Sequence, residues 1–332
     1  MGKTELVLLA VLAVAAISLY TLQPSKDVED RSFEAWKVKY GKKYSQLEET
    51  YRISVWLENL AYVESHNQRH QAGLETFDLE MNEFADMDTD EFAAKYLIKY
   101  PETVTSKCSG AQAPTTDLPE EVNWAEKSVV TGVKNQGQCG SCWAFSTTGS
   151  LEGVYAKTKG SIVSFSEQQL VDCSKSYGNA GCNGGLMNLS FFYVKDNGIT
   201  TEDKYPYHGV GSTCKYTADM KAWTISDCTE VTADKELAFR AAVALNPVSV
   251  AIEANHLSFQ LYKSGVYSGN CGTKLDHGVL AVGYGAENGK KYFRVKNSWG
   301  ATWGLKGYIL IANTGDGKGK CGILMAASYP IA

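Results

Sequence analysis

The residue best suited to chemistry is Cys142, within the string Gln136-Gly-Gln-Cys-Gly-Ser-Cys-Trp-Ala-Phe-Ser146. The pattern predicts a helix that starts at Ser141, with Ser141 as its N-cap, and ends near Gly160. A helix dipole stabilises an anion at its N-terminus, so it would lower the pKa of the Cys142 thiol and favour the nucleophilic thiolate. A structural cysteine is the commoner alternative on residue type alone.

Cys139 and Cys142 also form a C-x-x-C pair, the spacing of thiol–disulfide oxidoreductases. Such a pair is expected in a compact βαβ unit, whereas residues 122–138 before it are polar and loop-like. Many further cysteines follow it. A redox function is therefore disfavoured.

A cysteine nucleophile needs a base that takes its proton and returns it to the leaving group. The histidines that follow Cys142 are His208, His256 and His277. His208 lies in the turn-like string Tyr-Pro-Tyr-His-Gly, and His256 lies in a polar stretch after a predicted strand, so both are expected to be ordinary surface residues. His277 opens a predicted strand that would hold its ring rigidly.

Asn297 ends the predicted strand 292–296 and is followed by Ser-Trp-Gly. Its side-chain amide could accept a hydrogen bond from one imidazole nitrogen of His277 and thereby set the tautomer. Trp299 could exclude water from that bond.

The elements that must position these residues lie in the second of two unlike parts. The 332 residues carry a net charge of −5 and are 44% hydrophobic, enough for a sizeable core, and no basic tract indicates a nucleic-acid partner. Residues 1–117 hold 12 basic and 19 acidic side chains, and residues 118–332 hold 20 and 18. The first part is therefore at −7 and the second at +2. Residues 106–114 are small and polar, as expected of a linker.

Residues 1–18 carry Lys3 and then most of an apolar run over 6–19. The run is about 14 residues long, short of the ~20 that a helix needs to cross a bilayer. We therefore interpret residues 1–18 as a secretory signal peptide rather than a membrane anchor. Disulfides persist outside the cytosol, and nine cysteines leave at least one outside any intrachain pair.

The apolar periodicity predicts helices over residues 33–40 and 46–72 in the first part. In the second part, the helix from Ser141 is followed by short β-rich runs at 248–254, 278–285, 292–296 and 307–312. We expect a helical half followed by a β half.

Four separated strings of the second part, QGQCGSCWAFS, GCNGG, LDHGVLAVGYG and KNSWG, resemble the papain family of cysteine proteases. The first part resembles that family's inhibitory propeptide, in its long, cathepsin L-like form. The residues of the interspersed helix motif are Glu48, Arg52, Trp56, Asn59, Val63 and Asn67. Asn82, Phe84 and Asp86 match a later string, although Glu80 replaces its small first residue.

The resemblance implies an α+β, papain-like two-lobed peptidase, with a helical lobe and a β-barrel-like lobe. It implies a signal peptide at 1–18, a helical inhibitory propeptide at 19–117 and a mature domain at 118–332, with processing near Leu118. We hypothesise that the acidic propeptide covers the cleft near neutral pH and loosens as its carboxylates, Asp86 among them, are protonated. The charge asymmetry of the two parts motivates this hypothesis.

Carried over residue by residue, the resemblance implies that Cys142 attacks the peptide carbonyl, His277 shuttles the proton and Asn297 orients His277. Gln136 and the backbone N–H of Cys142 would stabilise the oxyanion, and the resting Cys142 would already be ionised. The substrate would contact Gly184, Gly185, Leu186, Met187, Ala251, Leu275, Asp276, Trp299 and Ala326. The apolar members imply a preference for Leu, Phe or other apolar side chains at P2, and Ala326 argues against Arg. The paired histidines of an exopeptidase occluding loop are missing, which favours an endopeptidase.

The resemblance also implies the disulfides Cys139–Cys182, Cys173–Cys214 and Cys271–Cys321. Cys108 and Cys228 match no position of the pattern. We interpret Cys228 as an unpaired thiol, with a bond to Cys108 as the weaker alternative. Asn188 opens the one glycosylation sequon, close to the expected cleft, and its occupancy is left open.

The expected partners are protein and peptide substrates, the chain's own propeptide and cystatin-type inhibitors. We expect a monomer with no cofactor, no metal, no nucleic-acid partner and, once the signal is removed, no membrane association. The expected compartment is the secretory pathway, ending in a lysosomal or endosomal lumen or outside the cell. A catalytically dead binding protein and a free-standing inhibitor are disfavoured because the complete set of expected catalytic residues is present.

Overall fold

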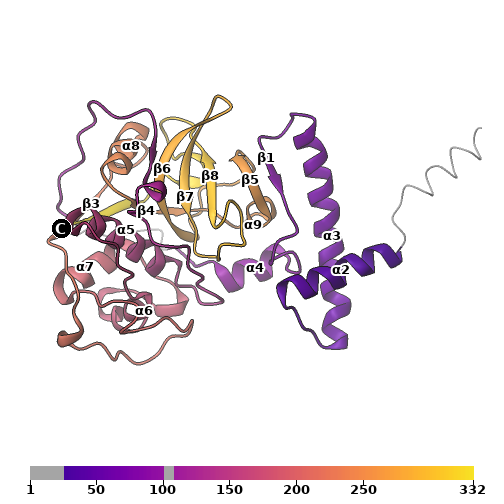
Figure 1. The fold of residues 1–332 in the computed structure, drawn as a ribbon, viewed down its shortest axis with the longest axis horizontal. Helices are drawn as coiled ribbons and strands as arrows, with labels where there is room; N and C mark the ends of the chain where they lie inside the picture. The colour runs from indigo at the N-terminus through magenta and orange to yellow at the C-terminus, as the bar shows by residue number, and fades with distance from the viewer. Residues whose placement is uncertain (1–25, 101–107) are drawn as a thin grey trace, which may run out of the picture. The chain divides into compact units, whose positions relative to one another are not determined.

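A computed structural model describes residues 26–100 and 108–332 (Figure 1). The expected signal peptide at 1–18 lies outside the described residues. The chain divides within one helix into two compact units, Met1–Ala61 and Tyr62–Ala332.

Two helices form the described part of the first unit. Helix α2 spans Lys26–Tyr40, and helix α3 spans Gln46–Gln71 and continues into the second unit. The rings of Phe33 and Trp36 stack with centroids 5.9 Å apart, and Trp56 meets Phe33 edge-on at 5.6 Å. Helix α3 has nearly the bounds that periodicity predicted, whereas α2 begins at Lys26, before the predicted start at Phe33.

The remaining elements of the expected propeptide belong to the second unit. Strand β1 (Phe77–Leu79) pairs antiparallel with β5 (Tyr262–Tyr267), and helix α4 spans Thr89–Tyr96. The side chain of Asp88 caps α4 by accepting from the N–H of Glu91, because the first N–H groups of a helix lack partners within it. Asn82 donates its side-chain amide to the carbonyl of Gln260 at 2.8 Å.

The helical lobe is built around α5 (Cys142–Lys159), which is buried on almost every side. It also contains α6 (Glu167–Cys173), α7 (Met187–Asn197) and the short helices η2 (Lys175–Tyr177), η3 (Gly181–Asn183) and η4 (Ala218–Met220), whereas the preceding β2 (Val122–Asn123) and η1 (Trp124–Glu126) contact the sheet of the other lobe. Helix α5 has nearly its predicted bounds and stops at Gly160, whose φ of 70° a side chain would disfavour. Ser141 occupies the N-cap position, but its hydroxyl makes no capping bond.

The β lobe is one sheet with the order β1-β5-β8-β7-β6-β4-β9-β3, to which β2 adds by pairing with β6. Its other elements are β3 (Asp227–Glu230), α8 (Glu236–Leu245), β4 (Val248–Ile252), α9 (Leu257–Gln260), β6 (His277–Glu287), β7 (Lys290–Lys296), β8 (Tyr308–Ala312), η5 (Lys320–Gly322) and β9 (Ala327–Ile331). The four predicted strands are present. The sheet is open, with β1 and β3 at its ends. The expectation of a barrel-like lobe is therefore corrected to a lobe built on an open sheet.

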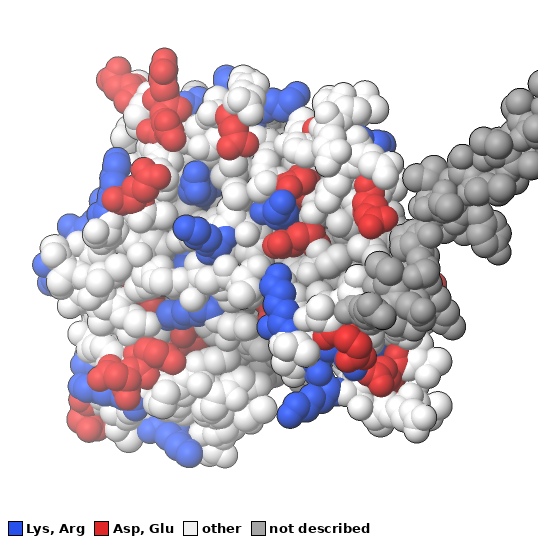
Figure 2. Space-filling model, turned by 45° about the vertical axis from the view of Figure 1, so that its right-hand side comes forward, with Lys and Arg blue, Asp and Glu red and all other residues white. Residues whose placement is uncertain are grey.

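The charged side chains on the face drawn in Figure 2 are of both signs and interspersed. Among residues 26–100 and 108–332, no helix combines the length and the apolar character that a membrane crossing requires.

Candidate active site

Cys142 is the first residue of α5 and is completely buried. The N–H of Gly278, on β6, points to its sulfur at 3.3 Å. A Cβ on Gly278 would lie 3.1 Å from the backbone N of Trp143. Glycine at this position therefore lets the sheet approach the start of the helix, which brings the neighbouring His277 to the same place.

His277 and Asn297 are joined by a hydrogen bond of 2.7 Å between Nε2 and Oδ1. An amide oxygen only accepts, so Nε2 carries the proton and the neutral ring keeps a lone pair on Nδ1. Nδ1 is buried and has no hydrogen-bond partner among the described residues. The N–H of Ser298 also donates to Oδ1 of Asn297 at 2.8 Å, which fixes the amide.

Trp299 covers the imidazole of His277, with ring centroids 4.6 Å apart and an angle of 25° between the planes. Two propeptide rings, Phe84 and Phe92, meet Trp299 edge-on at 5.8 and 5.0 Å. All four side chains are buried. Water is thereby kept from the bond between His277 and Asn297.

Burial affects the charge of both the Cys142 thiol and the His277 imidazole. It raises the pKa of Cys142 to about 12, although the N–H groups of Gly278 and Trp143 act in the opposite direction. It lowers the pKa of His277 to about 4, and the bond to Asn297 offsets this in part. Burial therefore favours the neutral form of both groups in the closed chain, and the ionised resting thiolate stays a prediction.

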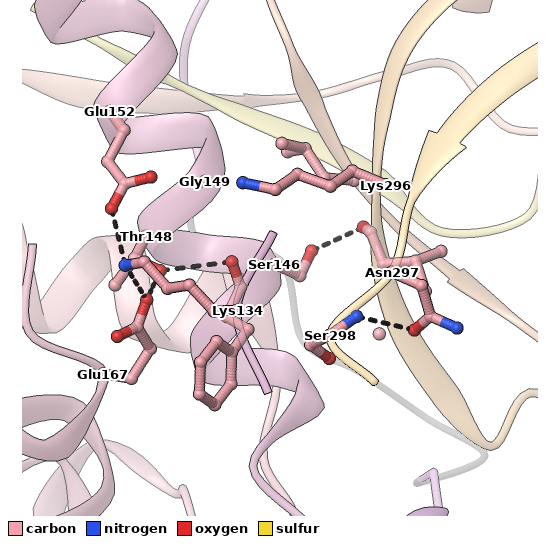
Figure 3. A pocket seen from close by; sticks show the side chains of 13 residues that line it. Lys134, Ser146, Thr148, Gly149, Glu152, Glu167, Lys296, Asn297 and Ser298 are labelled. Carbon is pink, nitrogen blue, oxygen red and sulfur yellow. Dashed lines mark hydrogen bonds and ion pairs between the residues drawn. The ribbon is translucent and has the colours of Figure 1, made fainter. Parts of the chain in front are cut away.

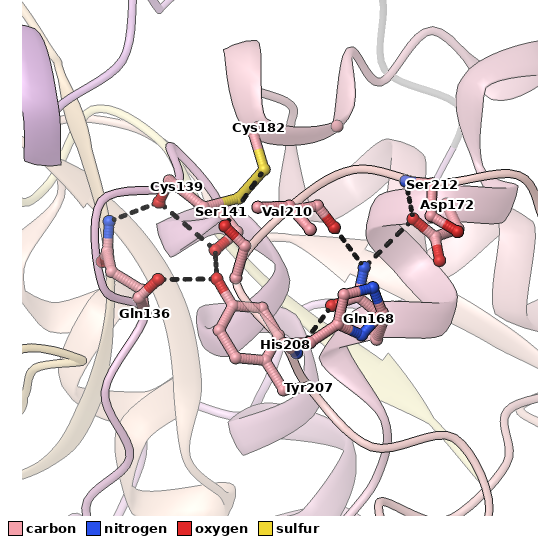
Figure 4. The surroundings of a disulfide bond; sticks show 12 residues. Gln136, Cys139, Ser141, Gln168, Asp172, Cys182, Tyr207, His208, Val210 and Ser212 are labelled. Carbon is pink, nitrogen blue, oxygen red and sulfur yellow. Dashed lines mark hydrogen bonds between the residues drawn. A yellow bond between two sulfur atoms is a disulfide. The ribbon is translucent and has the colours of Figure 1, made fainter.

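Gln136 is fully buried and donates its side-chain amide to two carbonyls at 3.1 Å each, those of Cys139 and of Tyr96 in the propeptide. Its Oε1 accepts from the hydroxyl of Ser298 at 2.7 Å. Figure 4 shows the hydroxyl of Tyr207 between the backbone of Gln136 and Ser141, beside the disulfide Cys139–Cys182. The contacts of Tyr207 with this loop were not foreseen, because only the tertiary fold brings it there.

The propeptide continues from Tyr96 along the expected substrate site. The N–H of Ile98 donates to the carbonyl of Asp276 at 2.8 Å, and a Cβ on Gly184 would contact Ile98 at 3.4 Å. A Cβ on Gly185 would lie 2.6 Å from the ring of Trp143. Glycines at these positions thus leave room for a main chain on one side and for the core on the other.

The structure brings some of the expected substrate residues to one cavity of about 1060 Å³. Met187, Leu275, Asp276 and Ala326 line it, together with Ile98 and Tyr100 of the propeptide. Ala251 lies fully buried in the hydrophobic core, and Leu186 is also buried. Glu230 lines the cavity as well and was not expected, because its place depends on the pairing of β3 with β9.

The three expected disulfides are present, and they join Cys139 to Cys182, Cys173 to Cys214 and Cys271 to Cys321. The interpretation of Cys228 as an unpaired thiol is wrong, because Cys228 is bonded to Cys108. No pattern in the sequence indicates this pair, since the two residues lie 120 positions apart. Cys142 alone is free.

The other histidines and the sequon lie outside this arrangement. His208 is exposed, and Nε2 of His256 lies 3.4 Å from the carboxylate of Glu253. Asn188 is buried, and its amide nitrogen donates to Glu230 at 2.8 Å. That nitrogen is the atom that glycosylation would modify, so the folded chain does not present it.

A buried ionic cluster lies behind Asn297 and lines a small cavity of about 20 Å³ (Figure 3). Lys134 binds Glu152 at 2.9 Å and Glu167 at 2.5 Å. Burial alone would lower the pKa of Lys134, but the two carboxylates outweigh it and the pKa is raised. The cluster joins α5 to α6 beneath the site.

Comparisons with known proteins agree with this geometry. The profile of the papain family cysteine proteases matches residues 118–331, and that of the cathepsin propeptide inhibitor domain matches residues 33–92. The chain therefore belongs to the papain family of cysteine proteases and carries its own inhibitory propeptide, so it is the zymogen of a cysteine protease.

Its relatives include procathepsin L of Mus musculus, 42% identical over 333 residues that cover 98% of this chain and 99% of that protein. Cysteine proteinase RD21A of Arabidopsis thaliana is 46% identical over 309 residues, which cover 90% of this chain and 66% of that protein. Among solved structures, digestive procathepsin L 3 from Tenebrio molitor larval midgut superposes with a TM-score of 0.83 at 38% identity. That match covers 92% of this chain and 99% of the other.

Proposed function

We propose that Cys142 is the nucleophile of a cathepsin L-like endopeptidase, with His277 as its proton carrier and Asn297 as the residue that positions His277. The observation that carries this proposal is the bond from Nε2 of His277 to Asn297. It leaves the lone pair of Nδ1 available as a base, on the residue next to the one whose N–H reaches the Cys142 sulfur. A protonated imidazole beside the thiolate would stabilise the reactive pair once the site opens.

The amide of Gln136 would stabilise the oxyanion together with the backbone N–H of Cys142. Its contact with the carbonyl of Tyr96 supports this role, because a propeptide carbonyl already occupies the amide in the zymogen. Preorganised donors of this kind contribute about 10² to 10³ in rate. The main chain of a bound substrate would then lie where the main chain at Ile98 lies in the zymogen. An apolar P2 side chain would contact Met187 and Leu275.

Activation would release the inhibitory segment, which lies within the propeptide expected at 19–117, from the mature domain expected at 118–332, and acid would favour this step. The closed zymogen holds His277 neutral with a pKa of about 4, below its ordinary value of 6.5. Its contribution to the stability of the closed form is therefore complete above about pH 6.5 and is lost as the pH falls towards 4. Asp276 acts in the opposite direction, because burial raises its pKa to about 7. The two parts of the chain carry net charges of −7 and +2, so they attract each other. Protonation of carboxylates in acid weakens this attraction, which favours opening in the same direction as protonation of His277.

The four disulfides support folding in the secretory pathway, with a lysosomal or endosomal lumen or the cell exterior as destination. The other proposed partners are cystatin-type inhibitors, which would bind the opened cleft of a monomer.

The proposed function is tested with fluorogenic peptides that carry Leu or Phe at P2, at acidic pH with a thiol reductant. The activated enzyme is titrated with iodoacetamide, and the alkylated residues are mapped by mass spectrometry. Turnover should disappear in step with alkylation of Cys142. Hydrolysis that persists when Cys142 is fully alkylated would overturn the proposal, and the untreated zymogen provides the inactive control.

A further inference from the structure

The disulfide between Cys108 and Cys228 crosses the expected processing site near Leu118. Cys108 lies ten positions before Leu118, and Cys228 lies in β3 within the mature domain. If the chain is cut between Cys108 and Leu118, the whole segment before the cut stays covalently attached to the mature domain through the disulfide.

Residues 108–112, which we name the strap, dock along β3 by more than the disulfide. The N–H of Gly110 donates to the carbonyl of Cys228 at 2.9 Å, and the side-chain amide of Gln112 donates to the carbonyl of Glu230 at 2.6 Å. The hydroxyl of Thr229 donates to the carbonyl of Ala111 at 3.3 Å. One backbone bond and two side-chain bonds thus hold the strap along β3 in addition to the disulfide.

Gly110 shows how closely the strap is fitted. A Cβ at this position would lie 2.2 Å from the hydroxyl oxygen of Thr229 and 2.8 Å from the carbonyl of Cys228. No side chain fits such a space. Residues 114–117 that follow the strap are all exposed, whereas Cys108 and Gly110 within it are partly buried.

We propose that the active enzyme keeps the strap, and that the inhibitory segment leaves only when the chain is cut before Cys108. This inference rests on the proposed function. After a cut within 114–117 alone, the segment that ends at Tyr100 would stay tethered at an effective concentration of the order of millimolar and would still fill the cleft. A dithiol could release it by taking over the disulfide: the two sulfurs gain two electrons and two protons, and the dithiol becomes oxidised.

The test replaces residues 114–117 in the full-length zymogen with the recognition sequence of an added protease. Two forms of this altered zymogen are compared, one with the Cys108–Cys228 disulfide and one with the substitutions Cys108→Ser and Cys228→Ser. Both are cut by the added protease in the absence of reductant. The wild-type product should retain its propeptide on a non-reducing gel and turn over a Leu-P2 peptide at least about tenfold more slowly than the serine pair. Equal release and equal turnover would overturn the proposal. If neither product hydrolyses the peptide even with reductant, the proposed function fails instead.

A second experiment needs no variant, so it tests the proposal even if the Cys108→Ser/Cys228→Ser protein does not fold. The unaltered zymogen is activated, and the intact mass and N-terminal sequence of the active enzyme are determined without reduction. The enzyme should begin before Cys108. A fully active enzyme that begins near Leu118 and has no strap attached would refute the inference.

A different observation concerns specificity, and it too rests on the proposed function. Glu230 lines the same cavity as Met187, Leu275 and Ala326, and the amide of Asn188 holds one of its carboxylate oxygens at 2.8 Å. Tyr100 of the propeptide also lines this cavity, and burial raises the pKa of its phenol, with Glu230 and Cys142 adding to the effect. The phenol therefore lies near both the carboxylate and the thiol.

We infer that Glu230 allows the enzyme to accept Arg or Lys at P2 as well as apolar side chains. Two more acidic residues, Asp276 and Glu253, line the cavity. Lys99 would leave with the propeptide. Among the described residues of the mature domain that line the cavity, Lys274 would then be the basic one. A long cationic P2 side chain would lie on the apolar wall and reach the carboxylate with its head. This inference differs from the expectation that Ala326 argues against Arg at P2.

Glu230→Gln should lower the ratio of kcat/KM for an Arg-P2 peptide to that for a Leu-P2 peptide about tenfold. Glu287→Gln is the matched control, because Glu287 is exposed at the end of β6 and is not among the residues that line the cavity. An Arg-to-Leu ratio that Glu230→Gln leaves unchanged would overturn the inference. Failure of the wild type to hydrolyse the Leu-P2 peptide would instead count against the proposed function.

Discussion

An activated Cys142→Ala variant is expected to hydrolyse a Leu-P2 peptide at least about 10⁴-fold more slowly than the activated wild type. The alanine removes the atom that attacks the substrate but keeps the start of α5, where the side chain is fully buried. The imidazole of His277 alone would then have no thiol to deprotonate. The measurement is kcat/KM after activation by an immobilised protease, because this variant cannot process itself.

Two controls separate loss of chemistry from loss of fold. Cys142→Ser keeps a group of similar size and should be almost as inactive, because its hydroxyl is a weaker nucleophile. The Cys108→Ser/Cys228→Ser pair removes two other cysteines and should retain turnover once its propeptide has gone. Activity of Cys142→Ala within tenfold of the wild type would eliminate Cys142 as the nucleophile.

In the intact zymogen, Cys142 should react with iodoacetamide at pH 7.5 at least about 10³-fold more slowly than in the activated enzyme. Burial raises the pKa of the Cys142 thiol far above this pH, so very little of the reactive thiolate is present. The side chain is also completely buried in the core cluster that contains Ile98. Removal of the propeptide would expose the sulfur and allow the ion pair with His277 to form. The rates are followed by peptide mass spectrometry.

The same measurement at pH 4.5 tests activation by acid. Over short incubations that precede processing, protection of Cys142 should be weaker than at pH 7.5, because protonation of His277 favours the open form. Equal protection and equally slow release of the propeptide at both pH values would contradict acid loosening. Rapid labelling of the zymogen at pH 7.5 would contradict closure itself.

The local geometry of the site could be predicted from the sequence because each part depends on a short stretch of chain. The start of α5 places Cys142, and the beginning of β6 and the end of β7 place His277 and Asn297. Periodicity and turn residues specify such boundaries. The carry-over of Gln136 needed the family resemblance, because a glutamine in a loop has no pattern of its own.

The features that were missed depend on pairings between distant segments. The resemblance to the papain family implied a barrel-like lobe, and periodicity could not correct it, because it does not reveal that β1 and β3 form open ends of the sheet. Likewise, Cys228 finds Cys108 only because the strap runs along β3. The neutral state of Cys142 depends on burial beneath a segment more than 40 residues earlier in the chain, which residue type alone does not indicate.

The pairing of β1 with β5 means that maturation also changes the sheet itself. When the propeptide leaves, the backbone groups of β5 that had β1 as their neighbour become a bare strand edge, a surface on which other chains can pair. Lys263, whose ammonium binds Asp78 in the zymogen, then stands on that edge as an unneutralised charge. Gly265, with a φ of 86°, bends the strand out of regular geometry at the same place. The segment that blocks the cleft thus also serves as a folding partner for the sheet, and charge and an irregular backbone guard the edge against aggregation after its departure.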